Sequence, residues 1–130
     1  MSEDFKVEIV NPDKSFLIKE DALEVVVPAF EGEMGILSNH ISIISFLKPG
    51  IIKILSKTGN EEYFVEDGII EFKKNNLSIL TSSILNIFDI DKSKKESLLK
   101  LAEEEVKKKD INDQTKYLLD QKIEVLKSLN

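Results

Sequence analysis

The sequence predicts an antiparallel β-sandwich or barrel that is followed by two helices. All 5 glycines and all 3 prolines lie at or before position 68, so the turn-forming residues are confined to the first part of the chain. In that part, turn signals recur roughly every 8–12 residues, as is typical of antiparallel all-β folds. Beyond position 90, apolar residues recur at helical spacing. We therefore expect a boundary between residues 88 and 91, which divides the chain into residues 1–88 and 89–130.

The strands are predicted from alternation and from the turns between them. Phe5, Val7 and Ile9 alternate with charged residues, the period-two pattern of a half-buried strand. Three hairpin turns, rich in glycine, asparagine and charged residues, are indicated at residues 57–60, 66–68 and 73–76. The last strands carry apolar residues such as Leu80 and Leu85 on both faces. We expect the helical part to cover their outer face.

The helical part begins with capping residues and continues with an apolar stripe in each helix. Asp91 or Ser93 can cap the first helix, and Asn112 or Asp113 can cap the second. The stripes consist of Leu98, Ala102 and Val106, and of Leu119, Ile123 and Leu126. Glutamates 103–105 precede lysines 107–109 at i,i+4 spacing, which favours helical ion pairs. Because both helices are narrow amphipaths, the sequence leaves open a permanently docked hairpin and a two-state element.

The composition excludes several classes of site. The chain of 130 residues has no cysteine, no tryptophan and one histidine, and its 18 basic residues are all lysine. Disulfides, thiol nucleophiles and thiolate metal sites are therefore absent, and we predict no metal site. A net charge of -6 argues against a nucleic-acid partner. The apolar runs are too short to span a membrane, and the acidic N-terminus does not have the pattern of a signal peptide, so a cytosolic location is the default.

The segment Glu31-Gly32-Glu33 attracts attention because two acids flank a glycine. A phosphate cradle would need a following helix and usually a lysine, so a contact loop is the better interpretation. His40 stands beside an apolar segment, and a lone histidine there usually has a packing or surface role. No set of nucleophile, base and orienting residue can be assembled, so we predict no catalytic residue.

Three segments resemble the epsilon subunit of bacterial F-type ATP synthases. Residues 25–40 read Val-Val-Val-Pro-Ala-Phe-Glu-Gly-Glu-Met-Gly-Ile-Leu-Ser-Asn-His, residues 47–50 read Leu-Lys-Pro-Gly, and residues 64–68 read Phe-Val-Glu-Asp-Gly. Their order and spacing match the family pattern over the whole chain. Ala29 and Asn39 stand where the family often has glycine, and asparagine tolerates the left-handed conformation.

The resemblance implies a fold, a function and a set of partners. The fold is an antiparallel ten-stranded β-sandwich followed by an antiparallel two-helix hairpin. The function is that of a non-catalytic central-stalk rotor subunit, which couples ion-driven rotation of the c-ring to ATP synthesis. Glu31, Gly32 and Glu33 would contact the c-ring, and Asn11 and His40 would contact the gamma subunit. The protein would be a peripheral one, held by the complex at the cytoplasmic face of the bacterial inner membrane.

The resemblance also raises two questions about the hairpin. In some relatives it extends along gamma, meets the alpha and beta catalytic subunits and blocks ATP hydrolysis. Others bind ATP through a motif that aligns here with Asp91 and Lys94, where the usual arginine is lysine. We therefore expect weak or absent ATP binding and no cofactor. An ATP-sensing module without a coupling role is the alternative function, and a carboxylate enzyme and an unrelated adaptor are the more distant ones.

Overall fold

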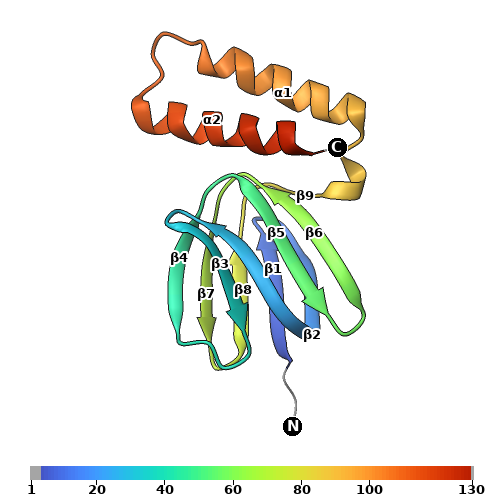
Figure 1. Ribbon diagram of the computed structural model, residues 1–130. Coiled ribbons are helices and arrows are strands. Elements are labelled where there is room, and N and C mark those ends of the chain that lie inside the picture. Colours follow the sequence, from blue (N-terminus) through green and yellow to red (C-terminus); the bar gives the residue numbers. More distant parts are fainter. Residues whose placement is uncertain (1–3, 130) are drawn as a thin grey trace.

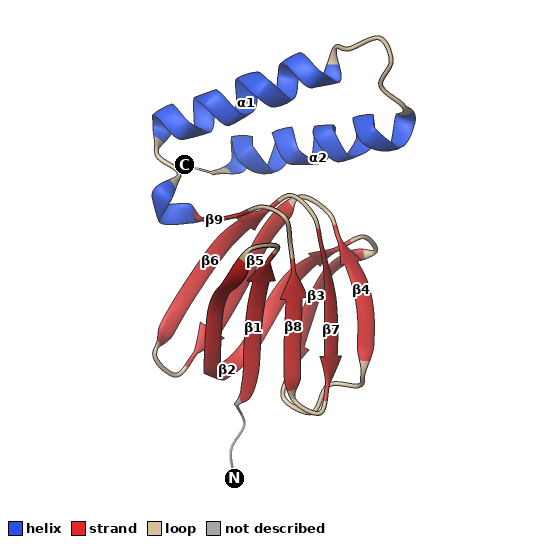
Figure 2. Cartoon of the chain, turned by 180° about the vertical axis from the view of Figure 1, so that it is seen from behind, coloured by secondary structure: helices blue, strands red, loops and turns tan. Residues whose placement is uncertain are grey.

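A computed structural model describes residues 4–129 as a two-layer β-sandwich with two helices at one end (Figure 1). The helices lie side by side, and the N-terminal end of the chain emerges at the opposite end of the sandwich (Figures 1 and 2). The elements are β1 (Phe5–Asn11), β2 (Lys14–Ala29), β3 (Gly32–Leu37), β4 (Ile43–Leu47), β5 (Gly50–Ser56), β6 (Gly59–Val65), β7 (Gly68–Lys73), β8 (Asn76–Leu80), β9 (Ile84–Asn86), the 3-10 turn η1 (Ile87–Asp89), α1 (Lys92–Val106) and α2 (Asp113–Ser128).

The predicted sandwich is confirmed, with two differences in its detail. Residues 4–129 contain nine strands rather than ten, and β1 pairs with β8 in parallel orientation, whereas the other pairings are antiparallel. The strand count differs because β2 is 16 residues long and belongs to both layers. Its first half pairs with β1, and its second half pairs with β3 and β5, with an irregular register between Ala22 and Glu24. Such a bulge bends a strand, so that one chain segment can turn from one sheet into the other.

The core lies between the two layers and follows the predicted alternation. Phe5, Val7 and Ile9 are all buried on the inner face of β1. The ring of Phe5 packs edge-on against Phe72 of β7, with 5.5 Å between the ring centroids. The core cluster of the sandwich contains no helical residue, so the sandwich is complete without the helices.

Two of the three predicted hairpin turns are present, at residues 57–60 and 73–76. There Gly59 has a φ of +140°, and Lys74 and Asn75 have φ values of 50° and 58°, as tight hairpin turns require. The predicted hairpin at residues 66–68 is wrong, because β6 pairs with β5 and β9 whereas β7 pairs with β4 and β8, so this segment connects the two layers. At Gly68, an added Cβ would lie 2.8 Å from the carbonyl oxygen of Leu80. The start of β7 therefore needs glycine at position 68 both for its φ of +158° and for the close approach of β8.

Both predicted helices are present, and the structure decides between the capping alternatives. Asp91 caps α1 by accepting a hydrogen bond from the backbone N–H of Lys94, and Asn112 caps α2 by accepting one from Thr115. The predicted i,i+4 pairs are wrong, because α1 ends at Val106 and the three lysines lie beyond it. In the described part of this segment, Lys108 instead lies 3.9 Å from Glu105, at i,i+3 spacing.

The helices dock on the sandwich through a second apolar cluster. Phe64 of β6, Ile90 and Leu126 of α2 are buried together, and the partly buried residues around them are Ile51, Leu85, Leu98, Leu99, Val125 and Leu129. The expected covering of the last strands is thus realised for Leu85. It is not realised for Leu80, whose side chain is 53% exposed. The predicted boundary between residues 88 and 89 falls within η1.

Candidate functional site

The Glu31-Gly32-Glu33 segment lies at the hairpin between β2 and β3, with Glu31 in the turn and Gly32 and Glu33 at the start of β3. Gly32 has a φ of +133°, a conformation in which an L side chain is strained. Glu31 and Glu33 are exposed, and the segment continues into a strand rather than a helix. This geometry does not fit a phosphate cradle, and the contact role of the two exposed carboxylates stays a prediction.

The turn is fixed to the neighbouring Leu-Lys-Pro-Gly segment at the helical end of the sandwich. The backbone N–H of Phe30 donates to Phe46 at 3.1 Å, and the N–H of Lys48 donates to Pro28 at 3.0 Å. An added Cβ at Gly50 would lie 2.4 Å from the Cβ of Pro28, so the two segments touch where glycine is required. Both motif segments thus build one rigid corner of the molecule.

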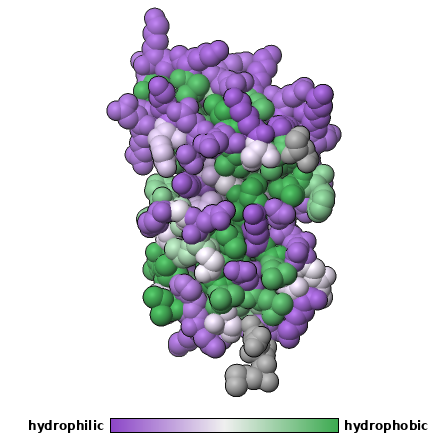
Figure 3. Space-filling view, viewed as in Figure 1, coloured by the Kyte–Doolittle hydropathy of each residue, from purple (hydrophilic) through white to green (hydrophobic). Residues whose placement is uncertain are grey.

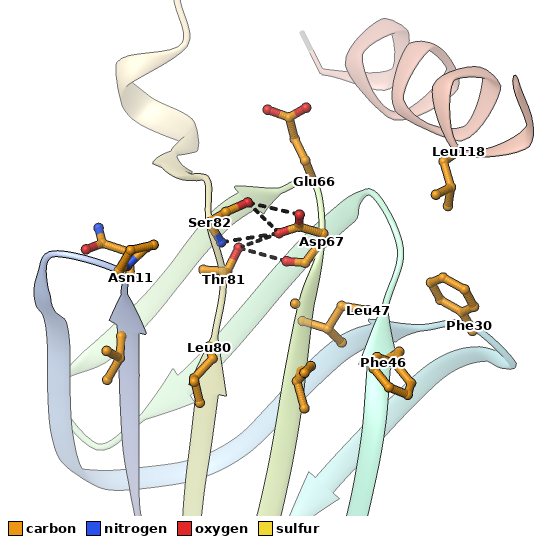
Figure 4. Close-up of a pocket in the computed structure, with 14 residues that line it drawn as sticks. Asn11, Phe30, Phe46, Leu47, Glu66, Asp67, Leu80, Thr81, Ser82 and Leu118 are labelled. Carbon is orange, nitrogen blue, oxygen red and sulfur yellow. Dashed lines mark hydrogen bonds between the residues drawn. The ribbon is translucent and has the colours of Figure 1, made fainter. Parts of the chain in front are cut away.

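An open groove runs across the end of β4, β7, β8 and β1 (Figure 4). Its volume is about 650 Å³. Apolar side chains from four strands and two turns line it, and Leu118 of α2 borders it on the helical side, as Figure 4 shows. The apolar lining residues are Val10, Pro12, Phe30, Phe46, Leu47, Ile69, Leu80 and Leu118. Phe46 and Leu80 are more than half exposed, which makes this surface suited to another apolar surface.

The polar end of the groove is held by Asp67. The Ser82 hydroxyl donates to the Asp67 carboxylate at 2.9 Å, and the Ser82 backbone N–H donates to it at 3.2 Å. The Thr81 hydroxyl donates to the Asp67 carbonyl oxygen at 2.7 Å (Figure 4). These bonds tie the turn before β7 to the end of β8, so the carboxylate of Asp67 has a structural partner.

The two residues predicted to contact gamma share a sheet but lie at its opposite ends. Asn11 ends β1 beside the groove, and its side chain accepts a hydrogen bond from the N–H of Asp13 at 3.3 Å. His40 precedes β4 at the other end and packs edge-on against Phe72, with 5.9 Å between the ring centroids. Nearby, Asn39 adopts a φ of 66° and exchanges hydrogen bonds with Asn75 at 2.7 and 3.2 Å. The substitution of asparagine for glycine at position 39 is therefore accommodated.

The residues of the predicted weak nucleotide site have a different arrangement. The carboxylate of Asp91 accepts a hydrogen bond from the backbone N–H of Lys94 at 2.8 Å, and both side chains are exposed. Asp91 thus serves as a helix cap, which weakens the case for a phosphate or ribose contact there. Over residues 4–129, no group of three or more histidine, cysteine, aspartate or glutamate residues could hold a metal ion.

One polar cluster on the sandwich has perturbed pKa values. Tyr63 donates to Glu61 at 2.5 Å, and Lys19 lies 2.5 Å from the same carboxylate. Burial alone would raise the pKa of the Glu61 carboxyl, but the hydrogen bonds from Lys19 and Tyr63 and the charge of Lys19 outweigh it, so the pKa is lowered. Burial, its hydrogen bond to Glu61 and the charge of Glu61 raise the pKa of Tyr63.

Sequence reasoning missed the groove and the residues that complete it. The available signal was the apolar character of Leu80 on a face that the helices leave open. Phe46 and Leu118 gave no comparable signal, because their neighbourhood depends on how β4 and α2 are placed. Figure 3 shows apolar surface at the edge of the sandwich where β4 lies, whereas the outside of the helical end is largely hydrophilic.

Fold and site together define a β-sandwich with a docked helical hairpin and an apolar contact groove. The sequence signature of the beta-sandwich domain of the ATP synthase Delta/Epsilon chain matches residues 4–87. The chain is 74% identical, over the full length of both chains, to the ATP synthase epsilon chain of Pelagibacter ubique. It is also 35% identical over 108 residues, 77% of this chain and 78% of the relative, to the sodium ion specific epsilon chain of Propionigenium modestum. The chain belongs to the ATP synthase epsilon chain family, whose members are non-catalytic subunits, as the sequence predicts.

Solved structures support the fold at lower sequence identity. A chain of the Euglena gracilis mitochondrial ATP synthase, in a structure of OSCP, F1 and the c-ring, superimposes with a TM-score of 0.76 at 20% identity. This alignment covers 99% of the present chain and 80% of that chain. A chain of the Tetrahymena thermophila central stalk and c-ring has a TM-score of 0.68 at 13% identity, covering 94% and 92% of the two chains. No helix within residues 4–129 has the length and apolar character needed to cross a membrane.

Proposed function

We propose that this chain is a central-stalk rotor subunit that couples ion-driven rotation of the c-ring to ATP synthesis. The 74% identity to an ATP synthase epsilon chain, over the whole of both chains, is the observation that carries the proposal. The similar Tetrahymena chain comes from a structure of the central stalk and c-ring, which supports the same placement. The chain would then sit at the cytoplasmic face of the bacterial inner membrane, attached only through the complex.

The gamma subunit is the partner that we assign to the groove end of the sandwich. The surface from Phe46 across Ile69 to Leu80 is apolar and exposed, and Asn11 lies at its border. Burial of exposed aromatic and aliphatic side chains provides most of the affinity in interfaces of this kind. His40 lies at the other end of the same sheet, so a gamma contact that includes both residues would extend along this whole face.

The c-ring is the partner that we assign to the β2–β3 turn. Glu31 and Glu33 present exposed carboxylates on a backbone that Gly32 holds in a positive-φ conformation. The net charge of -6 makes the chain complementary to polar or basic loops of a partner. Such complementarity would fix the orientation of this chain on the c-ring more than it would strengthen the binding.

The helical hairpin is the part that we assign to the control of ATP hydrolysis. Its docking cluster is small, and its outer faces are hydrophilic (Figure 3). Lys116, Lys122 and Lys127 on α2 are the residues that would meet acidic surfaces of the alpha and beta catalytic subunits. Lys116 and Lys127 are exposed, whereas Lys122 is paired with Glu66 while the hairpin is docked. In this proposal the hairpin restrains rotation in the hydrolysis direction.

Reconstitution tests the proposal directly. An ATP synthase freed of its own epsilon chain is titrated with this chain in membrane vesicles, and ATP synthesis and hydrolysis are measured. We expect saturable restoration of gradient-driven synthesis and lower hydrolysis. A chain that lacks residues 90–130 should restore synthesis but leave hydrolysis uninhibited. Unchanged synthesis with the full chain would contradict the coupling role. Inhibition of hydrolysis that changes when the chain binds ATP, without restored synthesis, would favour the nucleotide-sensing alternative.

A matched pair of variants tests the gamma surface. Phe46→Glu places a charge on the exposed groove surface, and Leu55→Glu makes the same change at a residue of β5 that is 42% exposed. We expect Phe46→Glu to weaken binding to gamma by about tenfold or more, as for a residue within an interface, and Leu55→Glu to change it by less than about twofold. Equal effects of the two variants would contradict the assignment of the groove.

A further inference from the structure

One ion pair joins the helical hairpin to the sandwich. The Lys122 ammonium of α2 lies 2.5 Å from the carboxylate of Glu66, which stands in the turn between β6 and β7. The Ser83 hydroxyl donates to the other oxygen of the same carboxylate at 3.0 Å. The remaining ion pairs between described residues lie within the sandwich or within the helical segment. Figure 4 shows Glu66 directed away from the sheet, toward the end of the molecule where α2 lies.

The pair is shielded from solvent more than an ordinary surface pair. The Lys122 side chain is 15% exposed and the Glu66 side chain is 34% exposed. Partial burial weakens solvent screening, and the hydroxyl of Ser83 holds the carboxylate in place before the lysine arrives. Loss of either partner would leave the other charge poorly solvated when the helix is docked.

The pair is also adjacent to the apolar groove. Leu118 and Lys122 are four residues apart on α2, so they project from the same face of the helix. Leu118 forms the helical wall of the groove, and Glu66 lines the groove as well. The position in which Lys122 meets Glu66 is therefore the position in which Leu118 lines the groove.

We propose that Lys122 and Glu66, with Ser83 as the positioning hydroxyl, form an electrostatic latch that holds the hairpin docked and keeps Leu118 at the helical wall of the groove. The apolar cluster of Phe64, Ile90 and Leu126 supplies contact area, and the latch supplies orientation. Because the latch is ionic, docking weakens as the salt concentration rises. The inference concerns the chain by itself and does not depend on the proposed rotor role.

Amide hydrogen exchange of the full chain tests the latch, with separate readouts for the hairpin and the sandwich. Lys122→Met keeps the aliphatic stem and removes the charge, and Glu66→Gln keeps the shape of the other partner. We expect either variant to speed exchange in α1 and α2 by about three- to tenfold while exchange in β1, β7 and β8 stays unchanged. The double variant should resemble the single ones, because the two charges act through one contact.

Two controls separate the latch from a general loss of charge. Lys100→Met removes an exposed lysine from the middle of α1 and should leave exchange within about twofold of the original chain, as an ordinary surface substitution does. The charge-exchanged chain, with Glu66→Lys and Lys122→Glu together, should recover most of the lost protection. Raising sodium chloride from about 0.05 M to about 0.5 M should speed hairpin exchange in the original chain and not in Lys122→Met.

The outcomes are distinct. Faster exchange confined to the hairpin, with recovery in the charge-exchanged chain, supports the latch. Exchange in Lys122→Met that equals that of Lys100→Met overturns it. Equal acceleration in the hairpin and the sandwich also overturns it, because the pair would then stabilise the whole fold rather than the docked position.

Discussion

The sandwich and the helical hairpin differ in how much of each is buried. The sandwich core draws inward-facing residues from both sheets, and its cluster contains sandwich residues alone. The two helices have three buried hydrophobic side chains, those of Ala102, Leu119 and Leu126, within residues 4–129. The docking cluster of the hairpin includes Phe64, which belongs to β6 of the sandwich. The difference teaches that the sandwich can be stable alone, whereas the order of the hairpin depends on where it is docked.

The largest effect is expected in the centre of the sandwich. Phe72 is fully buried and contacts the rings of both Phe5 and His40. Phe72→Ala would remove most of an aromatic side chain from the core and leave a cavity that the surroundings fill only in part, lowering the free energy of unfolding by about 3–5 kcal/mol. Urea denaturation followed by the far-ultraviolet signal of the strands measures this. If the free energy of unfolding fell by less than about 1 kcal/mol, the core would tolerate the cavity. The sandwich core would then differ less from the hairpin in how much its buried side chains contribute to stability.

A smaller effect, limited to one part of the molecule, is expected at Leu126. This side chain of α2 is fully buried against Phe64 and Ile90. Leu126→Ala should weaken hairpin docking by about 2–3 kcal/mol, while the unfolding midpoint of the sandwich stays nearly unchanged. Limited proteolysis at the segment between the helices reports docking, and urea denaturation reports the sandwich. An equal loss in both measurements would break the comparison, because the two parts would then unfold together.

The contrast also explains what the sequence could predict. Local rules were sufficient for the alternation of β1 and for the turn at Gly59, and they narrowed each helix cap to two candidates, since neighbours in the chain determine these features. They failed at residues 66–68, where the chain crosses to the other layer instead of forming a hairpin. The dual membership of β2 and the parallel pairing of β1 with β8 could not be read locally, because they depend on which distant strands meet.

The candidate site divides in the same way. The exposed Glu31-Gly32-Glu33 turn follows from its own residues. The groove and the pair of Glu66 with Lys122 join residues far apart in the chain, so no local pattern predicts them. The predicted pairs of glutamates 103–105 with lysines 107–109 were wrong for a related reason, since the end of α1 was placed too late.

The start of α1 offers a test of about 1 kcal/mol. Asp91 accepts a hydrogen bond from the N–H of Lys94, and Ser93 lies exposed within the first turn. Asp91→Ala should lower the stability of the docked hairpin by about 1 kcal/mol, because an otherwise unpaired N–H loses its acceptor. Ser93→Ala is the matched control and should have little effect. Hydrogen exchange of α1 measures both, and a larger effect at Ser93 would mean that the cap is misplaced.

The smallest effect is expected from acid, in the sandwich rather than the hairpin. The folded pKa of Glu61 is lowered from 4.5, so the stabilisation it provides is present above that value and is lost as the pH falls through the folded pKa. The carboxylate is partly exposed, which limits the contribution to about 0.5 kcal/mol. Between about pH 6 and pH 3, Glu61→Gln should therefore lose less stability than the original chain by about that amount.

The control for this acid effect is the neighbouring carboxylate. Glu62→Gln removes the same charge one residue away, outside the contacts with Lys19 and Tyr63. Its urea midpoint should follow the original chain across the pH range, and only Glu61→Gln should flatten the dependence. If both variants flattened it equally, the acid sensitivity would come from the net charge of -6 rather than from the Lys19–Glu61–Tyr63 cluster. The sandwich would then resemble the hairpin in depending on general electrostatics, and the contrast between the two parts would be confined to their apolar cores.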